Sequence, residues 1–220
     1  RTGTDLWRKA IEKEMKNVRP AFERWDDGTV DDAYRKLVGF QHIECHMVFD
    51  VKMDLTRKAR LVAGGHQTTP LAETVYSNVV SKDSVWIMFL LAALNNLDIL
   101  TADVQNAYLQ APMKEKVYTT RGLEFGASNI SRPVLIVRAL YGLRSSGARW
   151  HDELAKTLRG MGFESSRADP DVWMRRAAKP NGFEYWEYLV SYVDDVCCYS
   201  HNPRAAMDAL AKAYTLKEGS

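Results

Sequence analysis

Residues 189–200, LVSYVDDVCCYS, place two adjacent aspartates between two apolar runs. The pattern predicts a β-hairpin with Asp194 and Asp195 at its turn. Two-residue hairpin turns take positive φ and therefore favour Asn-Gly or Asp-Gly, so an Asp-Asp pair fits poorly. One interpretation is a solvated turn. The other is a divalent cation that binds both carboxylates together with a third acid from elsewhere in the chain.

Helical and strand patterns alternate along the rest of the chain. Alternating apolar residues over 43–53, a polar turn over 54–58 and an apolar return over 59–63 predict a second β-hairpin. A helix beginning at Ser81 or Ser84 and ending at Leu94 is apolar on nearly every side, which predicts that it is buried. The other predicted helices cover residues 4–20 (capped by Thr4 and ended by Pro20), 148–160, and a last one capped by Asn202 with Pro203 at its first position. The other predicted strands cover residues 99–104, 134–140, 172–176, 183–192 and 196–199.

This order predicts an α+β domain with antiparallel sheets. The 220 residues are enough for one large domain or two small ones. A formal net charge of +2 neither demands nor excludes a nucleic-acid partner, so any basic surface must be local.

Three signals concern the cellular setting. The three cysteines are odd in number, which argues against a disulfide framework and favours a reducing compartment. The longest apolar stretch, residues 85–94, is too short to span a bilayer, and no secretion signal is visible. We therefore expect no membrane partner. The first residue, Arg1, and the C-terminal Lys-Glu-Gly-Ser lead us to expect a piece of a longer polypeptide.

Asp103 is the candidate for the third acid. It is the only acid within the predicted strand over 99–104, and alternation puts it on the face shared by Ile99 and Thr101. Aspartate is depleted in strands and costly to bury unpaired. One interpretation is that Asp103 caps a helix that starts near Asn106. The other is that it converges with Asp194 and Asp195 on hard divalent cations, which take oxygen ligands. Two such ions would clamp the attacking and leaving oxygens of a phosphoryl transfer.

Four sequence blocks resemble the reverse transcriptase domain of Ty1/copia-type long-terminal-repeat retrotransposons. In chain order they are KARLVA at residues 58–63, ADVQNAYL at 102–109, ALYGLR at 139–144 and YVDD at 192–195. The resemblance implies an RNA-directed DNA polymerase with a right-hand fold of fingers, palm and thumb. It implies a fingers subdomain formed by residues 1–78 and 111–147 and a palm formed by residues 79–110 and 148–220. The palm is incomplete at its C-terminus and the thumb is absent.

The resemblance also implies the site residues. Asp103, Asp194 and Asp195 are the catalytic residues, and with Val104 they form the site for two Mg²⁺ ions, which Mn²⁺ can replace. Tyr108 stacks under the incoming sugar and excludes a 2′-hydroxyl. Lys58 and Arg60 grip the triphosphate, in keeping with their chemistry. Further substrate-binding residues lie in the loop against the template and the incoming base: Gly142, Arg144 and Ser145.

Two departures from the family pattern are visible. Many relatives have Lys-Gln-Ala-Pro-Arg where residues 144–148 read Arg-Ser-Ser-Gly-Ala, so Ser145 or a backbone N–H is left to replace the glutamine donor. The chain also stops where relatives continue into the last palm strands, the primer-gripping hairpin and the thumb. The implied partners are primer–template nucleic acid (RNA or DNA), dNTPs and the rest of a polyprotein with integrase and RNase H. The implied location is cytoplasmic, in a virus-like particle.

Other functions explain fewer of these residues. An inactive retroelement remnant or a noncatalytic nucleic-acid-binding module is the alternative that stays open. A metal-dependent nuclease or a nucleotide cyclase would leave Tyr108 and the KARLVA strand unexplained. Zinc is disfavoured because Cys45, His46 and His66 lack the spacing of a zinc site. We expect Trp150 and Trp173 to be core residues rather than platforms for stacking bases.

Overall fold

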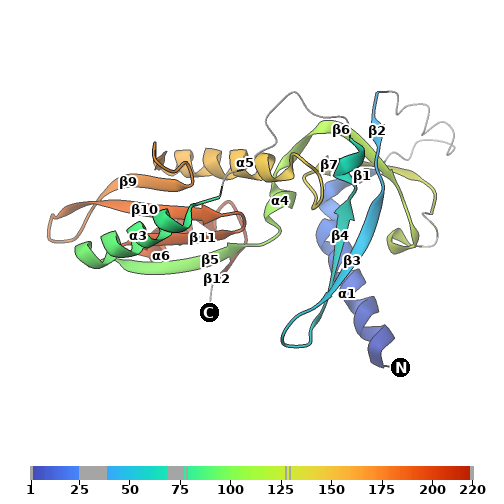
Figure 1. Cartoon of the computed structure of the whole chain (residues 1–220), viewed down its shortest axis with the longest axis horizontal. Helices are drawn as coiled ribbons and strands as arrows, with labels where there is room; N and C mark the ends of the chain where they lie inside the picture. Colours follow the sequence, from blue (N-terminus) through green and yellow to red (C-terminus); the bar gives the residue numbers. More distant parts are fainter. Residues whose placement is uncertain are drawn as a thin grey trace. The chain divides into compact units, whose positions relative to one another are not determined.

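The structure is a computed structural model that describes residues 2–24, 39–68, 77, 79–126, 128 and 130–218 (Figure 1). The chain forms two compact units. Unit 1 consists of Arg1–Val75 and Tyr108–Arg149, and unit 2 consists of Tyr76–Ala107 and Trp150–Ser220. The fold is α+β with mainly antiparallel sheets, which confirms the predicted class.

The described residues of unit 1 form two sheets and the long helix α1. Its four-stranded sheet has the order β1-β7-β6-β2, and its two-stranded sheet pairs β3 with β4 antiparallel. The elements are α1 (Thr2–Val18), η1 (Arg19–Ala21), β1 (Phe22–Arg24), β2 (Gln41–His42), β3 (Cys45–Val51), β4 (Arg57–Ala63), η2 (Gly65–Gln67), α4 (Ala107–Gln110), β6 (Pro112–Thr120), η3 (Leu123–Phe125) and β7 (Pro133–Arg138).

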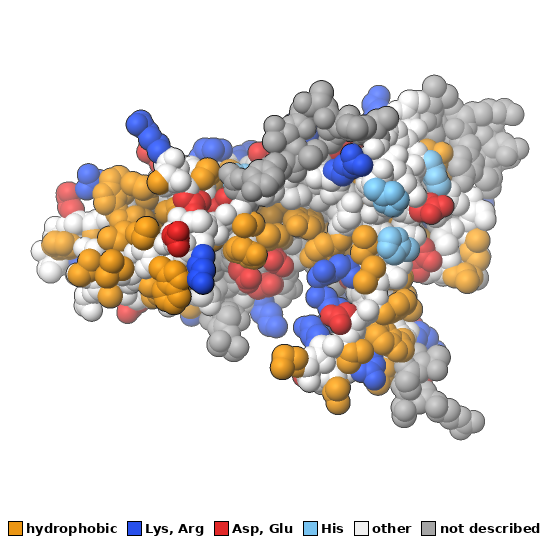
Figure 2. Space-filling view, viewed as in Figure 1, with side chains coloured by type: hydrophobic (Ala, Val, Ile, Leu, Met, Phe, Trp, Pro, Cys, Tyr) orange, Lys and Arg blue, Asp and Glu red, His pale blue; other side chains and the backbone are white. Residues whose placement is uncertain are grey.

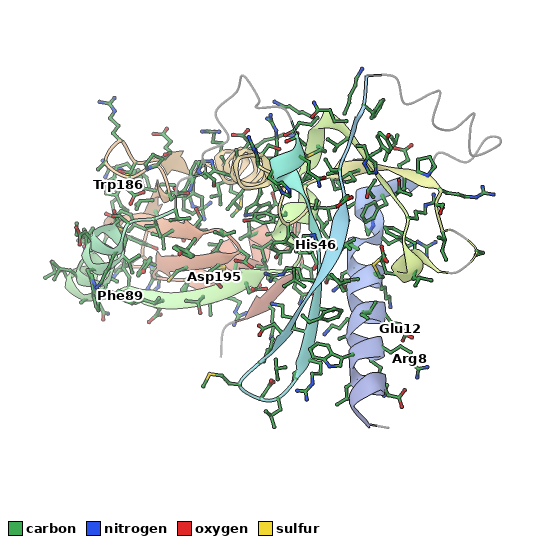
Figure 3. The ribbon with its side chains drawn as sticks, turned by 45° about the vertical axis from the view of Figure 1, so that its right-hand side comes forward. Arg8, Glu12, His46, Phe89, Trp186 and Asp195 are labelled. Atoms are coloured by element: carbon green, nitrogen blue, oxygen red, sulfur yellow. The ribbon has the colours of Figure 1, made fainter. Side chains whose placement is uncertain are left out.

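Helix α1 packs against β4, and its opposite face carries charged side chains. Arg8 lies 3.2 Å from Asp5 and 3.9 Å from Glu12, and both Arg8 and Glu12 point away from the β3–β4 hairpin (Figure 3). The helix begins at Thr2, so the predicted cap at Thr4 is wrong. Pro20 lies in η1, directly after the helix end, as predicted. The unit 1 core is made of buried apolar residues, among them Val18, Ile43, Leu61, Val117, Ile136 and Leu140.

Unit 2 is built on a six-stranded sheet with the order β12-β5-β11-β10-β9-β8, in which every pair is antiparallel. Its elements are α3 (Lys82–Asn95), β5 (Asp98–Val104), α5 (Ser146–Gly160, whose first residues belong to unit 1), β8 (Glu164–Ser165), β9 (Val172–Ala178), β10 (Glu184–Tyr192), β11 (Asp195–Ser200), α6 (Pro203–Leu210) and β12 (Leu216–Glu218). The predicted meander over β9, β10 and β11 is confirmed, as is the Asn202 cap of α6.

Helix α3 corrects one prediction. Ser81 caps it by accepting a hydrogen bond from the Ser84 N–H, as expected, but the helix is not buried. Met88 and Ala92 are its buried residues, whereas the side chains of its other faces are largely exposed: Trp86 (62%), Leu90 (59%) and Leu94 (73%). Figure 2 shows hydrophobic side chains gathered on the face of unit 2 that carries α3. Apolar residues on nearly every side of a helix therefore did not mean that every side is buried.

The β3–β4 hairpin also departs from its sequence pattern. Ile43 is buried, but the alternation fails toward the hairpin tip, where Phe49 and Val51 are half exposed. Short or irregular strands were missed altogether: β1, β2, β6, β8 and β12. Among the described residues, no helix is both long and apolar enough to cross a membrane.

Candidate active site

Asp103 and Asp195 are direct partners in the register between β5 and β11. Cross-strand partners point to the same face of a sheet, so the two carboxylates share one face. The neighbours of Asp103 along β5, Ala102 and Val104, are buried on the other face, while Asp103 is half-buried. The predicted adjacency of the Asp103 strand and the aspartate hairpin is confirmed.

The hairpin turn lies one residue earlier than its sequence indicated. Tyr192 pairs with Asp195, so the two loop residues are Val193 and Asp194, and Asp195 begins β11. Val193 has φ of 57° and Asp194 has no positive φ, the combination of a type II′ turn. Such turns favour glycine at the first loop position, and a β-branched residue with positive φ costs about 1–3 kcal/mol. The local strain falls directly beside the predicted catalytic residue.

Two hydrogen bonds hold this turn. The Val104 N–H donates to the Asp194 carbonyl oxygen at 2.7 Å, which ties the end of β5 to the turn. The Trp150 indole N–H donates to the Val193 carbonyl oxygen at 2.6 Å. Both carbonyls of the loop are therefore satisfied. Val104, a predicted metal-site residue, is itself buried.

Among the three carboxylates, Asp195 is the one whose environment opposes its charged form. Burial raises the pKa of Asp195 above its ordinary value, and the charges of Asp194 and Asp103 raise it further. Within the described part of the chain, no three His, Cys, Asp or Glu side chains are arranged as a ready-made metal site.

The predicted triphosphate residues lie on β4 in unit 1. The strand begins at Arg57, so Lys58 and Arg60 alternate onto the same face, as their joint role requires. Burial lowers the pKa of Lys58, and the positive charges of Arg60 and Lys52 lower it further. A Glu14 carboxylate oxygen accepts a hydrogen bond from the Leu61 N–H of this strand at 2.9 Å, and the charges of Arg60 and Lys58 act on that carboxylate. Two cations are thus held close together on one strand.

Three side chains of unit 1 contact one another in sequence, and the two tyrosine rings among them are tilted by 58°. The Arg60 guanidinium carbon lies 4.1 Å from the centroid of the Tyr141 ring, and the Tyr141 and Tyr108 ring centroids are 4.9 Å apart. Tyr141 therefore lies between the predicted triphosphate residue and the predicted sugar-contacting residue. A guanidinium stacked on a ring keeps its N–H donors at its edge, available to phosphate oxygens. Sequence analysis did not single out Tyr141, whose one signal is its place in the ALYGLR block.

The loop that carries Gly142, Arg144 and Ser145 docks on the end of β4. The Ala63 N–H donates to the Tyr141 carbonyl at 2.7 Å, and Arg144 donates to the His66 carbonyl at 3.3 Å. Gly142 has φ of 91°, and a Cβ there would lie 2.1 Å from the Ala63 carbonyl oxygen, so glycine is required. Ser145 is only 1% exposed, which argues against its hydroxyl as the substitute donor in the nucleotide pocket.

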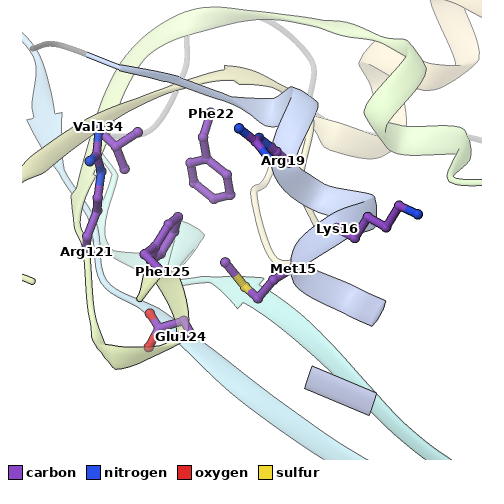
Figure 4. Close-up of a pocket in the computed structure, with 8 residues that line it drawn as sticks. All are labelled: Met15, Lys16, Arg19, Phe22, Arg121, Glu124, Phe125 and Val134. Atoms are coloured by element: carbon purple, nitrogen blue, oxygen red, sulfur yellow. The ribbon is translucent and has the colours of Figure 1, made fainter. Parts of the chain in front are cut away.

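Unit 1 also contains a pocket of about 440 Å³ (Figure 4). Its lining combines cationic, apolar and aromatic side chains with one acid: Met15, Lys16, Arg19, Phe22, Arg121, Glu124, Phe125 and Val134. None of the predicted site residues lines it. The pocket therefore has no part in the candidate active site.

Comparison with known proteins identifies the family. Residues 33–218 match the family model for reverse transcriptase (RNA-dependent DNA polymerase). The chain belongs to the reverse transcriptase family. This assignment confirms the resemblance drawn from the four sequence blocks.

The curated relatives of this reverse transcriptase chain are polyproteins of retrotransposons. It is 29% identical to the retrovirus-related Pol polyprotein from transposon RE2 of Arabidopsis thaliana over 97% of the chain and 15% of that protein. It is 27% identical to the Pol polyprotein from transposon TNT 1-94 of Nicotiana tabacum over 86% of the chain and 14% of that protein. It is 28% identical to the transposon Ty1-BL Gag-Pol polyprotein of Saccharomyces cerevisiae over 80% of the chain and 10% of that protein. The chain thus spans a small part of each relative's length.

Proposed function

We propose that this chain is the fingers and palm of an RNA-directed DNA polymerase from a copia-type retrotransposon. The fingers would be residues 1–78 and 111–147 and the palm residues 79–110 and 148–220, a division close to that of units 1 and 2. The reaction transfers a nucleotide from a dNTP to a primer 3′-hydroxyl and releases pyrophosphate. The observation that carries the proposal is the register pairing of Asp103 with Asp195, beside the Asp194 turn, in a chain of this family.

The carboxylate cluster fits a hard divalent cation. Its donors are oxygens, which Mg²⁺ prefers. Burial and then the charges of Asp194 and Asp103 raise the pKa of Asp195, and a cation would offset that repulsion. Asp103 and Asp194 would hold two Mg²⁺ ions, and Asp195 would be a looser ligand. Val104 would contribute through its backbone carbonyl oxygen, because its side chain has no oxygen. Mn²⁺ is the expected substitute. When bound, the ions activate the attacking hydroxyl and offset the charge of the leaving group.

The chain's own residues would bind and orient the nucleotide. Arg60 would direct its fork of N–H donors at the triphosphate while its flat face stays on Tyr141, and Lys58 would add a point charge. Tyr108, held by its contact with Tyr141, would lie against the sugar and exclude a 2′-hydroxyl. The loop of Gly142 and Arg144 would lie against the template and the incoming base.

The relatives' names support a polyprotein context. Each is a Pol or Gag-Pol polyprotein many times longer than this chain. The proposed partners are primer–template nucleic acid and dNTPs, which the family assignment supports, together with the integrase and RNase H regions that the sequence resemblance implies. The proposed location is the cytoplasm, within a virus-like particle.

Primer extension tests the proposal, with the chain expressed together with its flanking coding sequence. Asp103→Asn or Asp194→Asn removes a charged ligand but preserves shape, so extension with Mg²⁺ should fall by about two orders of magnitude or more. Asp195→Asn should be milder. Asp98→Asn is the matched control, because Asp98 is an exposed acid on the same β5 strand. Equal extension by wild type and Asp194→Asn would indicate a noncatalytic nucleic-acid-binding module or an inactive remnant.

A further inference from the structure

Trp150 combines deep burial with a hydrogen bond to the catalytic turn. Its side chain is 2% exposed, and its indole N–H donates to the Val193 carbonyl oxygen at 2.6 Å. The ring packs edge-on against Tyr214, with centroids 5.2 Å apart. The Tyr214 hydroxyl lies 2.7 Å from Thr157 Oγ1, also on α5. The indole is thus fixed in position relative to the helix that carries it.

The accepting oxygen belongs to the peptide between Val193 and Asp194. The orientation of this middle peptide distinguishes a type II′ turn from a type I′ turn. The opposite orientation would require positive φ at Asp194, a conformation that aspartate tolerates. The side chains of Val193 and Asp194 therefore do not by themselves exclude the type I′ orientation. Val193 is also unfavourable at the positive φ that it adopts. A hydrogen bond to the peptide oxygen selects one of the two orientations.

We infer that Trp150 is a positioning residue for the reaction. Its indole N–H holds the Val193–Asp194 peptide in the orientation that presents the Asp194 carboxylate to the metal site shared with Asp103. The inference rests on the proposed function, in which Asp194 binds metal. Sequence analysis predicted that Trp150 is a core residue, and the inference gives it a second role.

Trp173 provides a matched control within the same unit. It is 1% exposed, and among the described residues its Nε1 has no hydrogen-bond partner. Replacement of either tryptophan by phenylalanine removes a similar buried volume. Only Trp150→Phe removes a hydrogen bond to the turn as well.

Hydrogen exchange on the purified 220-residue chain tests the structural step without substrate or metal. The Val104 N–H donates to the Asp194 carbonyl, so its exchange reports how firmly the turn is held against the end of β5. Relative to the Cys198 N–H in the middle of β11, it should exchange about three- to tenfold faster in Trp150→Phe, the factor for one lost hydrogen bond. The ratio should not change in Trp173→Phe. An unaltered ratio in Trp150→Phe, or the same change in both variants, would overturn the inference.

Primer extension tests the functional step, again with the flanking coding sequence. Trp150→Phe should lower kcat about three- to tenfold and leave KM for dNTP unchanged, because the triphosphate residues are untouched. Trp173→Phe should have no comparable effect on kcat. Val193→Gly supplies a residue that type II′ turns favour, so in that background Trp150→Phe should cost about twofold or less. The same loss in both backgrounds, or an equal loss of kcat in Trp173→Phe, would count against positioning.

Asp194→Asn separates failure of the inference from failure of the proposed function. If Asp194→Asn extends primers as well as wild type does, the proposed function is wrong and Trp150 has no positioning role in the reaction. The exchange ratio then still decides whether Trp150 holds the turn. If Asp194→Asn abolishes extension and Trp150→Phe alters neither exchange nor kcat, the inference alone is wrong.

Discussion

At the scale of single residues, Asp195 shows how neighbouring carboxylates oppose stability. Its folded-state pKa is raised, first by burial and then by Asp194 and Asp103. A carboxyl whose pKa is raised on folding is favourable when protonated, and that contribution is lost as pH rises through the folded pKa. At neutral pH the charged Asp195 therefore destabilises the metal-free protein. Natural active sites commonly carry such a cost.

Asp195→Asn should accordingly raise the thermal midpoint of the metal-free chain at pH 7.5. The gain should shrink as pH falls toward the ordinary carboxyl pKa, because wild type then becomes protonated as well. Addition of Mg²⁺ should stabilise wild type more than the variant. Thermal melts between pH 4.5 and 7.5 measure this, with Asp98→Asn as the control. A midpoint gain that does not depend on pH would contradict the electrostatic cause.

Tyr108 is the residue expected to set sugar selectivity. Tyr108→Ala should admit ribonucleotides and lower dNTP-over-rNTP discrimination by roughly tenfold or more, because a steric barrier is removed while metal binding persists. Tyr108→Phe keeps the ring and should keep the discrimination. The measurement is the ratio of kcat/KM for the two nucleotides. Unchanged discrimination in Tyr108→Ala would refute the assignment.

Arg60 should be sensitive to a change that keeps its charge. Arg60→Lys loses both the bidentate fork and the flat stacking on Tyr141, so KM for dNTP should rise about tenfold and the rate should fall. Arg57→Lys is the control, since Arg57 lies on the same strand over the Trp7 ring of α1. Steady-state kinetics with varied dNTP decide the matter. Equal effects of both substitutions would argue against a triphosphate role for Arg60.

At the scale of elements, α3 shows that an apolar helix need not be buried. Met88 is 6% exposed and packs into the unit 2 core, whereas Leu90 on the same helix is largely exposed. Met88→Ala should therefore cost about 2–4 kcal/mol of unfolding free energy. Leu90→Ala should cost about 0.5 kcal/mol or less, as surface substitutions do. Urea unfolding followed by circular dichroism measures both. A large loss in Leu90→Ala would show that this face is covered in solution.

At the scale of the whole molecule, each unit has a hydrophobic core of its own. Leu61 belongs to the unit 1 core, and Val190 belongs to the unit 2 core. Leu61→Ala should lower the stability of unit 1 by about 2–5 kcal/mol. Because separately cored units open separately, amide exchange should accelerate on β6 and β7 and change little on β10 and β11. Equal acceleration in both units would mean that the chain unfolds as one cooperative body.

Local patterns in the sequence determined most of the elements and the catalytic candidates. The alternation over residues 43–53 predicted a hairpin, Asn202 and Ser81 marked two helix starts, and the position of Asp103 on a strand suggested a third carboxylate. These features depend on side-chain periodicity and capping within a few residues, which a sequence displays directly. The four family blocks did the same for the reverse transcriptase assignment.

Only the tertiary structure decided which of these features meet. The hairpin turn is at Val193 and Asp194 rather than at Asp194 and Asp195, because pairing with β10 and β5 sets where β11 begins. Packing decided that most of α3 stays exposed, since a sequence shows how apolar a helix is but not how many neighbours cover it. Long-range contacts placed Trp150 on the turn and Tyr141 between Arg60 and Tyr108. Each of these contacts joins residues far apart in the chain, and their proximity is a property of the folded whole.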